Sequence, residues 1–99
     1  MKRLLYSDFA TDDLKGILDY IARDKPSAAR AFVDAIIETC HQLAANPEMG
    51  MRREDLAPAL RMFTHQGYGI YYRNLDSDVM IERVLQPSLD VGRQYFGRS

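Results

Sequence analysis

The first half of the chain repeats its hydrophobic positions with the spacing of amphipathic helices. In residues 8–23 the apolar positions fall at i, i+3, i+4 and i+7, namely Leu14, Ile17, Leu18 and Ile21. Residues 27–45 carry a second apolar stripe, which predicts another helix with one buried face. Because only a few residues join the two segments, we expect them to form an antiparallel helix hairpin.

The pattern changes to strands on either side of this hairpin. Predicted strands, rich in aromatic and β-branched residues and separated by short turns, cover residues 2–6, 60–64, 68–73 and 79–86. Residues 47–58 contain Gly50 and two prolines without a clean period, and they are expected to form a loop. Residues 88–96 can add a short C-terminal helix with Ser88 as its cap.

The order of these elements is strand, helix, helix and then three strands. This order predicts a single α+β domain over residues 1–99, with the helix hairpin covering one face of a mostly antiparallel sheet. The N-terminal strand must pair with one strand of the C-terminal meander, and the pattern leaves open which one.

Composition narrows the class of protein. The chain has 99 residues, of which 46% are hydrophobic and 27% charged, as in ordinary globular domains. No apolar run approaches the ~18 residues that a membrane span needs, and acidic residues follow the start too soon for a signal peptide. The single cysteine, Cys40, excludes an internal disulfide, and we expect a reducing cytoplasm.

Charge and motifs exclude several chemistries. The net charge of −1 argues against a general nucleic-acid binder. Cys40 and His41 are neighbours on a predicted helix and point in different directions, and no metal-ligand spacing includes His65, so we expect no metal and no cofactor. No glycine-rich phosphate-binding motif occurs. On the apolar stripe of its helix, Cys40 is expected to be an inert buried thiol.

The basic residues of the second half are the remaining chemical signal. All seven basic residues of positions 51–99 are arginine, whose planar guanidinium suits carboxylate or phosphate. Metal-free RNA cleavage needs a base, an acid and cations around the phosphate. The candidates are Arg61, Arg73, Arg83, His65 and Glu54. The alternative is that these arginines are solvated or paired with acidic residues, and the unknown strand register leaves both interpretations open.

Five segments of the chain, in order, resemble signatures of the RelE/ParE toxin superfamily. They are Asp13-Leu14-x-x-Ile17-x-x-Tyr20-Ile21-Ala22, Leu43-x-x-Asn46-Pro47-x-x-Gly50, Leu56-x-Pro58-x-Leu60-Arg61, Tyr68-x-Ile70-x-Tyr72-Arg73 and Val79-x-Ile81-x-Arg83-Val84-Leu85. The resemblance implies the toxin of a type II toxin–antitoxin pair. It also implies a cognate antitoxin, ParD-like or another DNA-binding protein, in a hetero-oligomer with the toxin.

Within the superfamily the chain is more similar to ParE, whose members poison DNA gyrase, than to RelE, whose members cleave ribosome-bound mRNA. Family members commonly carry His and Arg where this chain has Gln86 and Leu89, which leaves a nuclease centre poorly equipped. The expected activity is therefore gyrase inhibition by binding, without a catalytic residue. A ribosome-dependent endoribonuclease and a non-toxic antitoxin-binding relative remain the alternatives.

The resemblance also suggests which residues carry the activity. Contacts to the target or the antitoxin are expected from Arg61, Arg73, Arg83, Tyr71 and Arg93. In the ribonuclease alternative, the catalytic residues are Arg61, Arg73, Arg83 and Tyr95.

Overall fold

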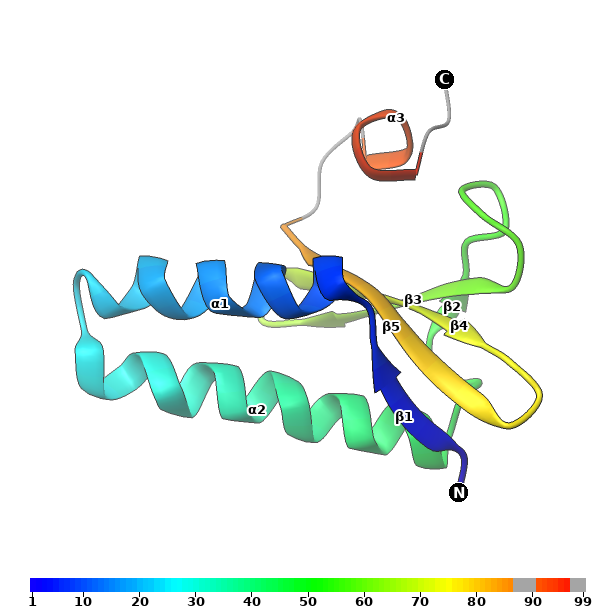
Figure 1. Ribbon diagram of the computed structural model, residues 1–99, viewed down its shortest axis with the longest axis horizontal. Helices are drawn as coiled ribbons and strands as arrows, with labels where there is room; N and C mark the ends of the chain where they lie inside the picture. Colours follow the sequence, from blue (N-terminus) through cyan, green and yellow to red (C-terminus); the bar gives the residue numbers. More distant parts are fainter. Residues whose placement is uncertain (87–90, 97–99) are drawn as a thin grey trace.

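The computed structural model, which describes residues 1–86 and 91–96, has a mixed five-stranded sheet with two long helices (Figure 1). Along the chain the elements are β1 (Arg3–Tyr6), α1 (Asp8–Ala22), α2 (Pro26–Ala45), β2 (Met51–Arg52), β3 (Leu60–His65), β4 (Tyr68–Asn74), β5 (Asp78–Leu85) and α3 (Val91–Phe96). The predicted α+β class is confirmed, and the two long helices and the main strands begin and end within two residues of the predicted positions.

Local chemistry explains where the two long helices begin. The Ser7 hydroxyl accepts a hydrogen bond from the Ala10 backbone N–H and so caps α1. Pro26 occupies the first turn of α2, where its missing N–H leaves no hydrogen bond unmade. The two helices pack against each other as the predicted hairpin (Figure 1).

The sheet has the strand order β1-β5-β4-β3-β2. The meander β3–β4–β5 is antiparallel as predicted, and β1 pairs in parallel with β5 from Asp78 to Ile81, which answers the question the sequence left open. One prediction is wrong: the expected loop 47–58 contains the strand β2, which pairs with β3. Both residues of β2 are exposed, so no alternation of buried and exposed positions marked them as a strand.

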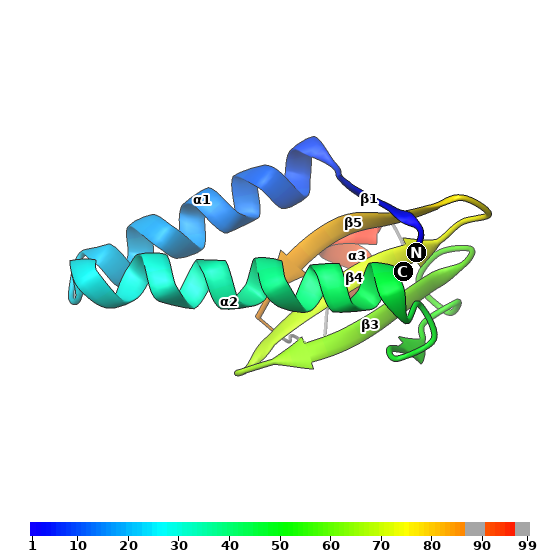
Figure 2. The same ribbon diagram turned by 90° about the horizontal axis from the view of Figure 1, so that it is seen from below.

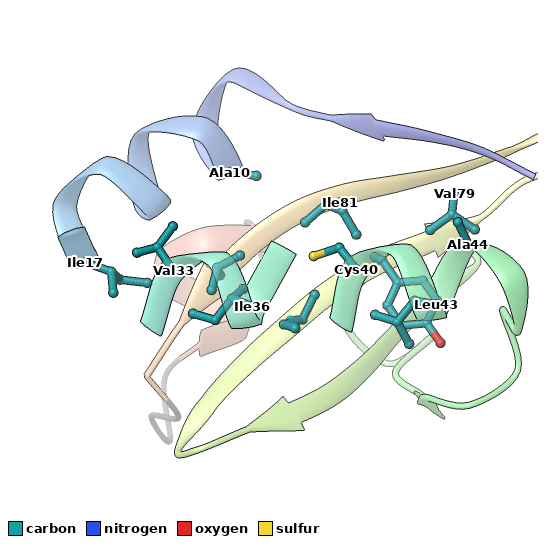
Figure 3. Close-up of a cluster of buried hydrophobic side chains, with 12 residues drawn as sticks. Ala10, Ile17, Val33, Ile36, Cys40, Leu43, Ala44, Val79 and Ile81 are labelled. Atoms are coloured by element: carbon teal, nitrogen blue, oxygen red, sulfur yellow. The ribbon is translucent and has the colours of Figure 1, made fainter. Parts of the chain in front are cut away.

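Each face of the sheet has its own hydrophobic cluster. Figure 2 shows α2 lying across one face, with α3 behind the sheet on the other. The larger cluster joins the hairpin to the sheet (Figure 3) and consists of Ala10, Ile17, Val33, Ile36, Cys40, Leu43, Ala44, Ile70, Tyr72, Val79, Ile81 and Val84. The smaller cluster, under α3, consists of Leu56, Ala57, Leu60, Tyr71, Leu85 and Val91. The predicted C-terminal helix thus corresponds to α3, while its expected cap Ser88 lies outside the described residues.

The segment after α2 is fixed to the sheet by a tyrosine. The Tyr72 hydroxyl donates to the Pro47 carbonyl at 2.7 Å and accepts from the Gly50 N–H at 2.8 Å. A Cβ on Gly50 would lie 2.5 Å from the same hydroxyl oxygen, so only glycine fits there. This contact gives a physical reason for the Asn46-Pro47-x-x-Gly50 pattern.

Candidate functional site

The predicted arginines lie on different parts of the sheet and do not converge. Cross-strand partners share a face, and Arg61 pairs with Tyr72 while Arg73 pairs with Leu60. Because Tyr72 belongs to the cluster under the hairpin and Leu60 to the cluster under α3, Arg61 and Arg73 project from opposite faces. A catalytic centre that uses both guanidinium groups is therefore not assembled in this structure.

Arg61 and Arg73 also have different partners. The Arg61 guanidinium donates to the Gly50 carbonyl at 2.7 Å, at the edge of the sheet. Arg73 forms an ion pair with Glu82, with 3.1 Å between Arg73 Nε and Glu82 Oε2. The Arg73 side chain remains 39% exposed, so it stays accessible to another molecule.

Arg83 is held within the chain by α1. A bulge between Tyr71 and Tyr72 leaves Glu82 without an opposite residue in the backbone register of β4 and β5. The next residue is Arg83, whose guanidinium donates two hydrogen bonds of 2.8 Å to the Asp13 carboxylate. Both side chains are largely buried, with 16% and 13% exposure, and the pairing raises the pKa of Arg83.

Two aromatic rings enclose the same guanidinium. Its carbon lies 5.1 Å from the ring centroid of Phe9 on α1 and 4.7 Å from that of Tyr95 on α3. These distances are typical of cation–π contacts. Of the predicted site residues, the structure therefore brings together Arg83 and Tyr95, and Asp13 and Phe9 complete a contact between three elements.

The remaining predicted positions lie near α3. Tyr71 is only 2% exposed and packs against Phe96, with 5.5 Å between ring centroids, and burial raises the pKa of its hydroxyl. Arg93 lies in α3, but its side chain and all of Leu89 are outside the described residues. Gln86 is exposed, directly after β5.

A cationic pocket follows the β2 edge of the sheet. Arg52 stands directly opposite Arg61, an arrangement that like charges disfavour. The two line a pocket of about 240 Å³ whose other walls include Glu54, Ala59, Leu60 and Asn74. Arg61 binds carbonyl oxygens and no carboxylate in the described part of the chain. Two guanidinium groups thus remain available for an anionic partner at this edge.

An apolar groove runs between β1 and the helix hairpin. It encloses about 420 Å³ and is lined by Leu4, Tyr6, Leu14, Leu18, Val33 and Ile37, with Thr11, Lys15 and His41 at its polar positions. The hydrophobic pattern had placed Leu14 and Leu18 on the apolar stripe of the first predicted helix. The structure leaves both partly exposed at the groove between β1 and the two helices.

His65 and Cys40 were the residues considered for metal binding and nucleophilic catalysis. Thr39 Oγ1 is 3.1 Å from His65 Nδ1 on the far side of the sheet from α3. Cys40 is fully buried, and burial raises the pKa of its thiol to about 11. Over residues 1–86 and 91–96, no group of three or more His, Cys, Asp or Glu side chains could hold a metal ion.

The structure defines a small α+β domain, with a helix hairpin on one face of a five-stranded sheet and an apolar groove beside the hairpin. The family model of the ParE toxin of type II toxin–antitoxin systems, parDE, matches residues 4–88, and the chain therefore belongs to this family. Toxin ParE3 of Caulobacter vibrioides is 33% identical over 89 residues, which cover 85% of this chain and 89% of that toxin.

A solved structure agrees at the level of the fold. The chromosomal ParDE toxin–antitoxin system from P. aeruginosa contains a chain that matches with a TM-score of 0.77 and 23% identity. The match covers 89% of this chain and 98% of that chain. Among helices in the described ranges, none is long and apolar enough to cross a membrane.

Proposed function

We propose that this ParE-type toxin inhibits DNA gyrase by binding it, and that a cognate antitoxin neutralises the toxin by covering its surface. The observation that carries the proposal is the family match over residues 4–88, nearly the whole chain. ParE members, in the resemblance described above, poison gyrase. Because gyrase acts on the chromosome, the proposal includes a cytoplasmic location.

The antitoxin is assigned to the apolar groove between β1 and the hairpin. The groove is lined by six apolar or aromatic side chains. An amphipathic helix buries its apolar face in such grooves. Lys15 at the groove margin can pair with an acidic residue of the bound helix. The similar chain from P. aeruginosa belongs to a ParDE toxin–antitoxin system, which supports an antitoxin as the occupant.

The placement of the arginines supports binding over RNA cleavage. Arg61 and Arg73 project from opposite faces, and Arg83 is engaged by Asp13. Metal-free phosphodiester cleavage would need these cations around one phosphate. A binding surface has no such requirement, and the exposed Arg73 and the Arg52–Arg61 pocket can each contact an acidic partner surface.

The test combines growth with a purified target. Expression of the chain alone should arrest growth with filamentation and an induced DNA-damage response. Purified toxin should block supercoiling of relaxed plasmid by gyrase, and equimolar antitoxin should restore it. Unchanged supercoiling at micromolar toxin would refute the gyrase assignment. Fragmented mRNA in a translating extract would favour the ribonuclease, and normal growth with soluble toxin would favour a non-toxic relative.

A further inference from the structure

A second groove flanks α1 on the side away from the apolar groove. It encloses about 400 Å³ between α1 and the ends of β4 and β5. Asp12, Asp13, Gly16, Ile17 and Tyr20 form one wall, and Tyr68, Val84 and Gln86 form the other. Its volume is in the range of pockets that hold small ligands or single long side chains.

Gly16 is the feature of this groove that the fold does not explain. A glycine inside a helix destabilises it by roughly 1 kcal/mol relative to alanine. Its φ is not positive, and a Cβ built on it would meet nothing within 4 Å. Neither backbone conformation nor packing within the chain therefore requires glycine, whereas close approach of a partner chain to α1 would.

The polar and aromatic groups beside Gly16 point to the chemistry of the occupant. Asp12, Gly16 and Tyr20 recur every four residues, so they form one ridge of α1. Within the described chain Asp12 forms no ion pair, and Tyr20 is 66% exposed. Tyr68 faces the groove from β4 and is supported from behind by Phe32, with 5.7 Å between ring centroids. A carboxylate without an ion pair and two tyrosine rings, all lining one groove, suit a cation, and a planar guanidinium best of all.

The neighbouring turn of α1 already contains such an arrangement within the chain. There Asp13 pairs with Arg83, while Phe9 of α1 and Tyr95 of α3 cover the guanidinium. The second groove offers the same combination with Asp12, Tyr20 and Tyr68. In this groove, however, no arginine of the described chain is present.

We propose that the groove at Gly16 binds an arginine side chain of the antitoxin, at the point where the antitoxin chain crosses α1 after leaving the apolar groove. The choice of occupant rests on the proposed function. α1 carries four aspartates against one lysine, which favours a basic segment. The two grooves lie on opposite flanks of the same helix, so one chain can occupy both, and the missing side chain of Gly16 opens its path.

The first experiment tests the groove without the antitoxin. Acetyl-Gly-Arg-Gly-amide is titrated into ¹⁵N-labelled toxin, and backbone amide shifts are followed. We expect saturable shifts at Gly16 and Tyr20, with affinity about tenfold weaker for the citrulline peptide and for Asp12→Asn. Asp76→Asn, in the turn between β4 and β5, is the matched charge control and should change nothing. Shifts spread evenly over all acidic residues would overturn the site.

Gly16→Leu separates binding from stability. Leucine is a better helix former than glycine, so we expect a Tm about 4 °C higher, while its side chain fills the groove and abolishes the peptide shifts. Antitoxin affinity should fall on the order of thirtyfold, whereas Ala31→Leu on the exposed face of α2 should leave it unchanged. Unaltered antitoxin affinity in Gly16→Leu would overturn the occupant. If the wild-type toxin bound no antitoxin at all, the proposed function would fail, and the peptide titration would still decide the groove.

Discussion

Replacing Asp13 with alanine tests whether Arg83 serves the fold. The Asp13 carboxylate accepts two hydrogen bonds from Arg83 and a third from the Val84 backbone N–H at 3.0 Å. Without it, a guanidinium that is only 16% exposed and one backbone N–H lose their partners. Breaking a buried pair in this way costs about 3–5 kcal/mol, and residual solvent access places our expectation near the lower end, at about 3 kcal/mol.

The assay is urea unfolding followed by far-UV circular dichroism, because the chain contains no tryptophan. Asp34→Ala is the matched control, since Asp34 pairs with Arg30 at the surface of α2 with 61% and 78% exposure. That pair should contribute about 0.3–0.5 kcal/mol or less. The double variant Asp13→Leu/Arg83→Met removes both charges and should recover most of the loss. Equal effects of Asp13→Ala and Asp34→Ala would refute the structural role of the pair.

Four further predictions concern the core and the surface. Gly50→Ala should lower the free energy of unfolding by about 1–3 kcal/mol, because its Cβ collides with the Tyr72 hydroxyl. Ile36→Ala should lower it by about 2–5 kcal/mol, because the substitution leaves a cavity. Urea unfolding measures both losses. Arg73→Ala should reduce growth arrest while the free energy of unfolding in urea stays within about 1 kcal/mol of wild type, since its ion pair is partly exposed; undiminished arrest would refute its role. Burial raises the pKa of Cys40 from 9.0 to about 11, so the unfolded thiol loses its proton first. Stability should therefore fall as pH rises from 9 to 11, and a smaller fall in Cys40→Ala would confirm the source.

The helices could be predicted because their signal is local. A stripe of apolar residues at helical spacing, with Ser7 as cap and Pro26 in the first turn of α2, needs no knowledge of the rest of the chain. The meander could be predicted equally well, because turn residues separate its strands. The pairing of β1 with β5 could not be predicted, because a parallel partner 75 residues away leaves no local pattern in the sequence.

The candidate site was harder to predict because it depends on register. The sequence allowed Arg61, Arg73 and Arg83 to surround one phosphate, but the strand pairing puts the first two on opposite faces and Asp13 of α1 binds the third. A shift of one residue reverses which face a strand side chain occupies. The grooves on either side of α1 depend on how helices and strands pack, which no periodicity encodes.

The first turns of α1 replace a strand along the exposed edge of β5. β1 ends at Tyr6, opposite Ile81 of β5. From there on, the Ser7 N–H donates to the Ile81 carbonyl and the Ser7 hydroxyl donates to the Glu82 carbonyl. The Asp13 carboxylate accepts from the Val84 N–H. The same helix forms a wall of both proposed antitoxin grooves. A substitution in α1 can therefore weaken antitoxin binding either by removing a contact or by releasing the helix from β5. Since Arg83 is tied to this edge, lost toxicity in an Arg83 variant identifies a target contact only if the free energy of unfolding is unchanged.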